Sequence, residues 1–203
     1  MQPTSVIFDV GHVLYDWSPR VLYQRLFDDE RALDVFLNEV ATREWHFQHD
    51  AGRPFAETSA ELAERFPDHA DMIALWGPRF GEQIPGPIPG MIAIVEELDA
   101  AGVPLFAITN FSHEFFPPFR AREAAVFDRF RDIVVSGDER LVKPDAAIYH
   151  LALDRFGLTP GEAFFIDDNA ANIAGAAAVG IHAHLFRDAA TVRAALVEHG
   201  LLR

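Results

Sequence analysis

The sequence predicts an α/β protein: a Rossmann-like parallel sheet with helices on both faces, plus a small α-helical cap inserted after the first strand. Two observations predict this fold. From residue 89 onward, short apolar segments alternate with segments of helical periodicity, as in a chain of β-α units. Between the first apolar segment and Pro85, in contrast, the chain is almost wholly helix-patterned.

The expected strands are short apolar segments bounded by Gly, Pro, Asp or Ser, which is typical of buried parallel strands. They cover Ser5–Asp9, Val103–Thr109, Asp132–Ser136, Ala163–Asp167 and Ile181–Phe186. Apolar residues at helical spacing lie between the later strands, and glycines follow where these helices are expected to end, at Gly102, Gly157, Gly180 and Gly200.

The predicted cap covers residues 15–85, and the core covers residues 1–14 and 86–203. Ser18 is expected to cap a helix that starts at Pro19. Further helices are indicated by two apolar sets, the first of Ala32, Leu33, Phe36, Leu37 and Val40, and the second of Leu62, Ala63 and Phe66. The proline-rich stretch Ile84–Gly90 predicts a stiff linker back to the sheet.

Composition excludes several classes of function. The 203 residues suffice for one full-sized domain and a modest insertion, and their net charge of −14 disfavours nucleic acid as a partner. No apolar run is long enough for a membrane helix, and no export signal is visible, so we expect a cytoplasmic protein. Because the chain has no cysteine, catalysis must rest on oxygen or nitrogen groups.

Polar residues close the predicted strands at the edge where open α/β sheets bind ligands. They are Asp9, the pairs Thr109-Asn110 and Asp167-Asp168, and Lys143 shortly after the third strand. Each alone has a structural explanation, such as a turn, a helix cap or a solvated side chain. Together, however, the carboxylates require a cation, and all-oxygen ligands favour Mg²⁺. Lys143 and Thr109 would then face a small anion, an arrangement suited to phosphoryl transfer.

Four segments of the chain resemble, in order, the four motifs of the haloacid dehalogenase superfamily. The segments are Phe8-Asp9-Val10-Gly11-His12-Val13-Leu14, Ile108-Thr109-Asn110, Val142-Lys143-Pro144-Asp145 and Ile166-Asp167-Asp168-Asn169. The resemblance covers the whole chain, including a helical cap after the first motif. It is specific for the fold and the metal site and much less specific for the substrate.

The resemblance implies a role for each motif residue. Asp9 would be the nucleophile and a Mg²⁺ ligand, and the Gly11 carbonyl and Asp168 would be the second and third ligands. Asp167 would belong to the same metal site and would help to position Lys143. The transferring phosphoryl group would be bound by Thr109, Asn110 and Lys143. Attack by a carboxylate forms an aspartyl-phosphate, which divides one difficult displacement into two. The implied function is Mg²⁺-dependent hydrolysis of a small phosphorylated metabolite.

Position 11 departs from the usual phosphatase pattern. Most phosphatases of this superfamily carry a second Asp there, which protonates the leaving group and then activates water, whereas this chain has Gly11. A branch that resembles sugar-phosphate phosphatases also has Asp-x-Gly. His12 is the nearest titratable side chain, and it could bind the substrate and serve as the proton donor in place of the missing acid. Without an acid, the rate should depend steeply on the leaving group.

Two other functions compete with a phosphatase. In a 2-haloacid dehalogenase Asp9 would attack carbon and expel halide, which needs no proton, and Arg20 or Arg43 could bind the substrate carboxylate. The adjacent Asp167-Asp168 pair argues against this, because the dehalogenase branch works without a metal. The third possibility is a catalytically weak, phosphate-binding relative.

Two histidines and several aromatic residues are assigned structural roles. His46 and His49 lack a nearby third metal ligand and are expected to line or cover the cap surface. Trp17, Trp45, Phe47, Phe111 and Phe115 are expected to pack in the core or the cap hinge, and those nearest the cap and the second motif could form the walls of a substrate pocket.

Overall fold

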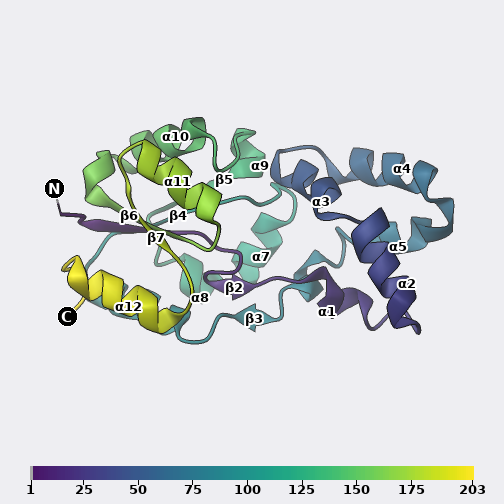
Figure 1. Cartoon of the computed structure of the whole chain (residues 1–203), viewed down its shortest axis with the longest axis horizontal. Coiled ribbons are helices and arrows are strands. Elements are labelled where there is room, and N and C mark those ends of the chain that lie inside the picture. The colour runs from purple at the N-terminus through teal and green to yellow at the C-terminus, as the bar shows by residue number, and fades with distance from the viewer. Residues whose placement is uncertain (1) are drawn as a thin grey trace.

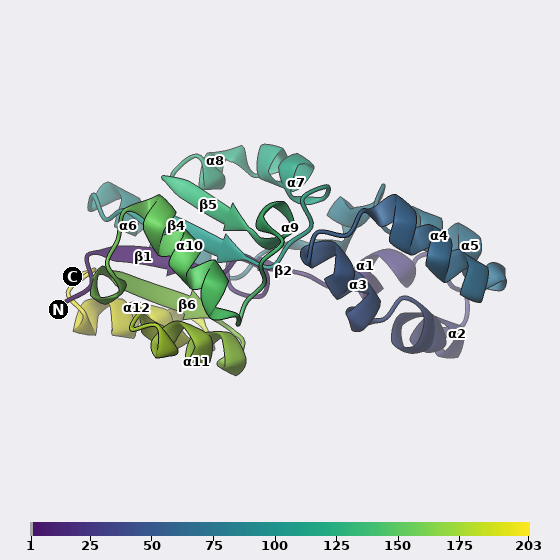
Figure 2. The same ribbon diagram turned by 90° about the horizontal axis from the view of Figure 1, so that it is seen from above.

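The fold is built on a five-stranded parallel sheet in the order β5-β4-β1-β6-β7 (Figures 1 and 2). The structure is a computed structural model that describes residues 2–203. The strands are β1 (Ser5–Phe8), β4 (Leu105–Thr109), β5 (Asp132–Val135), β6 (Ala163–Asp167) and β7 (His182–Leu185). All five predicted strands are confirmed, with shifts of at most two residues at either end. Strand β1 lies in the centre because its apolar side chains, Val6, Ile7 and Phe8, are fully buried on both faces.

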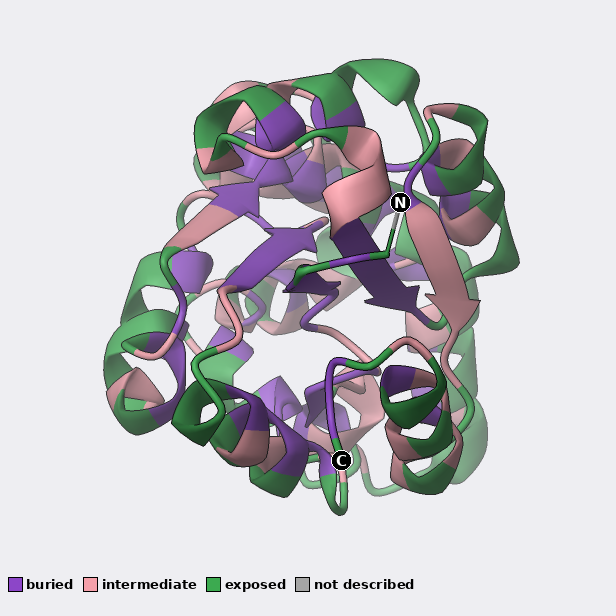
Figure 3. Ribbon diagram, turned by 90° about the vertical axis from the view of Figure 1, so that its left-hand side faces the viewer, coloured by how far each residue is buried: buried purple, intermediate pink, exposed green. Residues whose placement is uncertain are grey.

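Helices cover both faces of the sheet, as predicted (Figure 1). One face carries α10 (Ala146–Phe156) and α11 (Ala170–Ala178), and the other carries α6 (Met91–Ala100), α8 (Ala124–Phe127) and α12 (Ala189–Glu198). Each face has its own hydrophobic cluster, and buried residues line the inner sides of these helices in Figure 3. The core is completed by α7 (Phe116–Arg122), α9 (Ser136–Glu139) and η4 (Pro160–Glu162).

The region between the first two sheet strands is helical, and we keep the name cap for its residues 15–85. It contains α1 (Pro19–Tyr23), α2 (Glu30–Val35), η1 (Phe36–Val40), α3 (Arg43–Asp50), α4 (Phe55–Arg65), η2 (Pro67–His69), α5 (Ala70–Leu75) and η3 (Phe80–Gln83). These helices extend from the core at the end where the sheet strands finish (Figures 1 and 2). The expected helix over residues 32–40 ends as a turn of π-helix.

A two-stranded antiparallel ribbon joins the cap to the core. Strand β2 (Tyr15–Asp16) pairs with β3 (Gly86–Pro87), so two residues of the predicted stiff linker over Ile84–Gly90 form a strand that the sequence did not indicate. The ribbon holds the outgoing and returning chains together. At the start of α1, Pro19 is the first helical residue as predicted, but the Ser18 side chain makes no capping hydrogen bond.

Within residues 2–203, no helix has both the length and the apolar character needed to cross a membrane.

Candidate active site

The parallel sheet brings Asp9 and Asp167 to the same edge. Asp9 directly follows β1, and Asp167 is the last residue of the neighbouring strand β6, with Phe8 aligned to Ile166. Strand β4, on the other side of β1, ends at Thr109. The three strand ends predicted to carry the chemistry are therefore adjacent in the structure.

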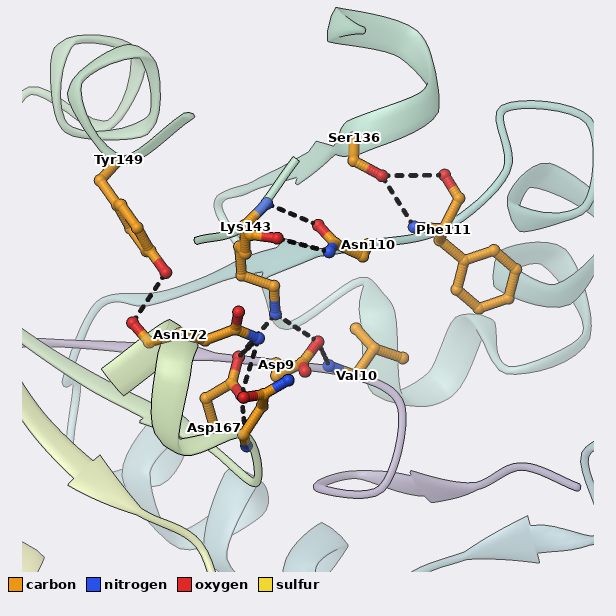
Figure 4. Close-up of polar contacts among 10 residues, drawn as sticks. Asp9, Val10, Asn110, Phe111, Ser136, Lys143, Tyr149, Asp167 and Asn172 are labelled. Carbon is orange, nitrogen blue, oxygen red and sulfur yellow. Dashed lines mark hydrogen bonds and ion pairs between the residues drawn. The ribbon is translucent and has the colours of Figure 1, made fainter. Parts of the chain in front are cut away.

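Lys143 lies between two carboxylates. Its Nζ is 2.9 Å from Asp9 Oδ1 and 2.7 Å from Asp167 Oδ2 (Figure 4), and its side chain is fully buried. Burial alone lowers the pKa of Lys143, but the charges of Asp9 and Asp167 outweigh it and raise the pKa. The site therefore holds a buried ammonium group rather than the solvated lysine that is usual before a proline.

Lys143 is also the one lysine among the chain's 17 basic residues; all the others are arginine. An ammonium is a compact point charge, whereas guanidinium is a wide planar fork. The buried space between the two carboxylates therefore suits the smaller ammonium group better than a guanidinium group. The use of lysine at this one position in an arginine-rich chain is a sequence signal for the site that does not depend on any motif.

Asp167 holds Lys143 in place and has little capacity left for other ligands. Its Oδ1 accepts hydrogen bonds from the Asn169 backbone N–H at 2.8 Å and from Asn172 Nδ2 at 3.0 Å, while Oδ2 accepts from Lys143 and Asn172 (Figure 4). The alternative that this acid caps α11 does not apply, because the Asn169 side chain is the cap. Asn172 was not identified from the sequence.

Asn110 binds the backbone of Lys143 on both sides. Its Nδ2 donates to the Lys143 carbonyl at 3.0 Å, and its Oδ1 accepts from the Lys143 N–H at 2.9 Å (Figure 4). The side chain that the resemblance assigns to phosphoryl binding therefore fixes the loop that carries the lysine. Asn110 also lines the cavity above the site.

Three carboxylates form a group suited to a divalent cation. Asp9, Asp167 and Asp168 each offer an oxygen within 4.8 Å of the others. Burial raises the pKa of Asp9, with Lys143 opposing it and the charge of Asp167 adding to it. Burial and Asp167 also raise the pKa of Asp168. Crowded carboxylates of this kind fit Mg²⁺, which prefers oxygen ligands, and Asp9 and Asp168 are the two not already saturated by hydrogen bonds to their neighbours.

Thr109 contributes a buried hydroxyl with no partner. Its side chain is fully buried, and its Oγ1 makes no hydrogen bond among residues 2–203. A buried hydroxyl without a partner costs free energy, so a bound anion next to it would relieve that cost. Neither Thr109 nor Lys143 borders the open cavity; both are buried, next to the lining residues Asn110 and Asp9 respectively.

A cavity of about 300 Å³ opens above these residues, between the core and the cap. Its polar lining comes from both sides, and its walls include aromatic side chains. The lining residues are Asp9, Gly11, His12, Trp17, Arg43, His46, Phe47, Asp50, Phe80, Asn110, Phe111, Asp168, Asn169 and Asn172. Of the aromatic residues expected to pack in the core or the cap hinge, with a pocket wall as the alternative, Trp17, Phe47 and Phe111 line the cavity. Asp50 and Phe80 were not identified from the sequence.

Of the three candidate polar residues in the first loop and the cap, two border the cavity and one does not. His12 borders the cavity with its backbone in the left-handed region (φ 56°) and its Nδ1 3.6 Å from Asp16 Oδ1. Arg43 also borders the cavity. Arg20 instead pairs with Glu30 and Asp34 at the exposed surface of the cap.

The expectation that His46 and His49 cover the cap surface is wrong, because both are buried. His46 stacks on Trp17 and Phe80, and His49 Nε2 lies 2.7 Å from Thr58 Oγ1. Burial lowers the pKa of His46 to about 3 and that of His49 to about 4. Both rings are therefore neutral parts of an aromatic cluster.

We expect His49 to destabilise the protein in mild acid. Below about pH 6.5 the unfolded chain protonates this ring, while the folded protein excludes the proton until about pH 4. Relative to His49→Gln, the parent should lose about 2 kcal/mol of unfolding free energy between pH 7 and pH 5. Urea unfolding of the parent and of His49→Gln at both pH values measures this change. The other titrating groups are the same in both proteins, so their contributions cancel in the comparison. A constant difference would mean that the ring is protonated in the folded state.

The comparison with family models identifies one family for this chain. Residues 4–180 match the model of the haloacid dehalogenase-like hydrolases. A haloacid dehalogenase family enzyme of Bacteroides thetaiotaomicron, solved as a magnesium complex, superimposes with a TM-score of 0.71 over 93% of this chain and 95% of that one, at 18% identity. That likeness shows the shared fold.

Curated relatives include proteins with different activities. The chain is 26% identical to a sesquiterpene phosphatase of Aspergillus oryzae over 87% of its length and 86% of the relative. It is 33% identical to an (S)-2-haloacid dehalogenase of Burkholderia cepacia over 46% of this chain and 40% of the relative. It is 34% identical to acyl-CoA dehydrogenase family member 10 of Mus musculus over 71% of its length, but spans only 12% of that longer protein.

Proposed function

We propose, because this chain belongs to the haloacid dehalogenase-like hydrolases, that it hydrolyses small phosphate monoesters through an aspartyl-phosphate formed on Asp9. The observation that carries this proposal is the buried ammonium of Lys143 between Asp9 and Asp167, beside a carboxylate group suited to Mg²⁺. Attack on a phosphate monoester needs positive charge from both the ammonium and the metal ion, because the negative phosphate oxygens repel an attacking carboxylate.

Each residue of the site has a part in this chemistry. Asp9 attacks phosphorus, with its orientation fixed by the Val10 N–H, which donates to Oδ1 at 2.7 Å. Lys143 and the Thr109 hydroxyl stabilise charge on the phosphoryl oxygens. Mg²⁺, held by Asp9, Asp168 and the Gly11 carbonyl, would offset the repulsion between carboxylate and phosphate. Asp167, Asn172 and Asn110 keep Lys143 in place.

We infer that the cap selects the substrate. The cavity of about 300 Å³ is at the small end of ligand sites, so it suits a small metabolite. Trp17 and Phe80 from the cap and Phe111 from the core offer flat apolar walls. A sugar ring or a hydrocarbon leaving group would pack on these walls, and the sesquiterpene phosphatase among the relatives supports the second.

A 2-haloacid dehalogenase is the second candidate, and one observation favours it: Arg43 borders the cavity and is available for a substrate carboxylate. The matched (S)-2-haloacid dehalogenase supports it in sequence. In that reaction Asp9 attacks carbon, and no metal is needed. A phosphate-binding relative without turnover is the third candidate, and the retention of Asp9, Lys143 and Asp168 argues against it.

Removing divalent cations separates these candidates. We expect excess chelator to abolish phosphatase activity and Mg²⁺ to restore it. Mg²⁺ should also stabilise the folded protein by about 2.7 kcal/mol at 100 times its dissociation constant, which thermal unfolding detects without any substrate. The Asp168→Asn variant should lose most of this stabilisation, because it lacks one of the two free carboxylates.

The outcome that contradicts the proposal is equally clear. Full hydrolysis of a phosphate ester in excess chelator would exclude the metal-dependent reaction. Release of halide from 2-chloropropionate in chelator, with no phosphatase activity under any condition, would establish the dehalogenase instead. Saturable phosphate binding without turnover of either substrate class would favour the third candidate.

A further inference from the structure

The proposed reaction needs a proton donor that position 11 does not supply. An alkoxide is a poor leaving group unless it is protonated as its bond to phosphorus breaks. Space does not explain the missing acid, because a Cβ added at Gly11 would meet no atom within 4 Å. The proton must therefore come from another acid that lines the cavity.

Asp50, at the end of helix α3 in the cap, is such an acid. It lines the same cavity as Asp9, Gly11 and Asp168, yet its surface is only 7% exposed. Asp168 is one of the carboxylates that would bind the metal ion, and Asp167 forms an ion pair with Lys143. Asp50 is thus a cavity acid that neither the metal nor the lysine requires.

The core fixes the position of Asp50 although the residue belongs to the cap. Ser136 Oγ donates a hydrogen bond to the Asp50 carbonyl at 2.5 Å and accepts one from the Phe111 N–H at 2.9 Å. The next turn packs on α9, where Gly52 (φ 90°) leaves no room for a side chain: a Cβ would lie 2.9 Å from the Gly137 carbonyl oxygen. Figures 1 and 2 both show α3 beside α9.

The surroundings of Asp50 keep its carboxyl protonated. The nearby His46 Nε2 is 3.7 Å from Oδ1, too far for a hydrogen bond, and the His46 ring is neutral. Burial raises the pKa of Asp50 to about 8, with the negative charge of Asp9 adding to it and Lys143 opposing it. A carboxyl of this kind carries a proton at neutral pH and can donate it.

We propose that Asp50 is the catalytic acid and base of this site, supplied by the cap in place of the residue missing at position 11. This inference rests on the proposed phosphatase function. As Asp9 attacks phosphorus, the bond from phosphorus to the leaving oxygen breaks, and that oxygen takes the Asp50 proton. The Asp50 carboxylate then takes a proton from water as the water oxygen attacks phosphorus, which releases inorganic phosphate and the free Asp9 carboxylate. Both protons are thereby accounted for.

The test compares two esters in the Asp50→Asn variant, which keeps the shape and neutrality of the side chain but cannot transfer a proton. With p-nitrophenyl phosphate, whose leaving group needs no acid, we expect a rapid burst of about one nitrophenolate per protein and then slow turnover, because the base for water is missing. With a primary alkyl phosphate, alcohol release should fall by about 10²- to 10⁴-fold without a burst. Glu44→Gln, on the exposed first turn of α3, is the control and should match the parent.

The results that overturn the proposal are specific. An equal loss of the first step on both esters, with a lowered melting temperature, would make Asp50 a structural residue. Unchanged turnover of the alkyl ester would also exclude it, and a burst in His12→Gln instead would assign proton transfer to His12. If the parent protein hydrolyses neither ester, the proposed phosphatase function itself is wrong. If the parent hydrolyses both esters, only the role of Asp50 is in question. With Asp50 as the acid, the rate of the parent protein should depend only weakly on the pKa of the leaving group. The absence of an acid at Gly11, taken alone, predicts a steep dependence.

Discussion

Replacing Asp9 by asparagine is expected to abolish turnover, with a loss of about 10⁴-fold or more. The amide is a poor nucleophile and a weaker ligand for a divalent cation. The fold should persist, because the amide oxygen of the new side chain can still accept the Val10 N–H and the change removes a buried charge. Steady-state hydrolysis of p-nitrophenyl phosphate, together with thermal unfolding, measures both effects.

The control for Asp9→Asn is Asp154→Asn, the same substitution at an exposed site in α10. It should leave turnover and stability unchanged. Turnover by Asp9→Asn within tenfold of the parent would contradict nucleophilic attack by this carboxylate. A large drop in melting temperature would make the loss of activity a folding defect and would require isolation of the folded fraction before the rate is compared.

Replacing Lys143 by methionine is expected to lower the free energy of unfolding by about 3–5 kcal/mol, besides removing activity. Methionine has a similar length and no charge, so Asp9 and Asp167 would remain buried without their counter-ion. Denaturant unfolding in chelator measures this loss. Addition of Mg²⁺ should return part of the stability, because the cation replaces the missing positive charge at the same carboxylates.

Arg155→Met is the matched control for Lys143→Met. Arg155 also pairs with two carboxylates, Asp132 and Glu139, but these ion pairs are partly exposed to solvent. Loss of exposed pairs costs about 0–1 kcal/mol. Equal stability of the parent and Lys143→Met would mean that the two buried carboxylates are neutral without the lysine, which would contradict its role as their counter-ion.

The sheet and the floor of the site were predictable because they depend on local signals. Each buried strand is a short apolar run, and the polar residue that closes it must lie at the shared edge of a parallel sheet. Asp9, Thr109 and Asp167 follow from this rule. Lys143 lies outside a strand, but its place shortly after the third strand marked it as a candidate, and the four-motif resemblance pointed to the same residue. The structure places it between the two carboxylates.

The cap side of the cavity was not predictable from local patterns. Asp50 and Phe80 are ordinary residues at a helix end and in a short helix, and they reach the cavity only because α3 docks on α9 and the cap folds over the sheet edge. His46 and His49 were misplaced for the same reason: their burial depends on rings contributed by Trp17, Phe80 and other distant segments. The β2–β3 ribbon has two residues per strand, too few for a strand pattern.

Asp9 is expected to become phosphorylated during turnover. Acid quenching within the first turnover of p-nitrophenyl phosphate, followed by pepsin digestion at the same acidic pH and mass spectrometry of the peptide that contains Asp9, tests it most directly. We predict one phosphoryl group on this peptide, located at Asp9, increased in Asp50→Asn and absent from Asp9→Asn. An unmodified peptide at every quench time, in both the parent and Asp50→Asn while product is released, would contradict the aspartyl-phosphate mechanism.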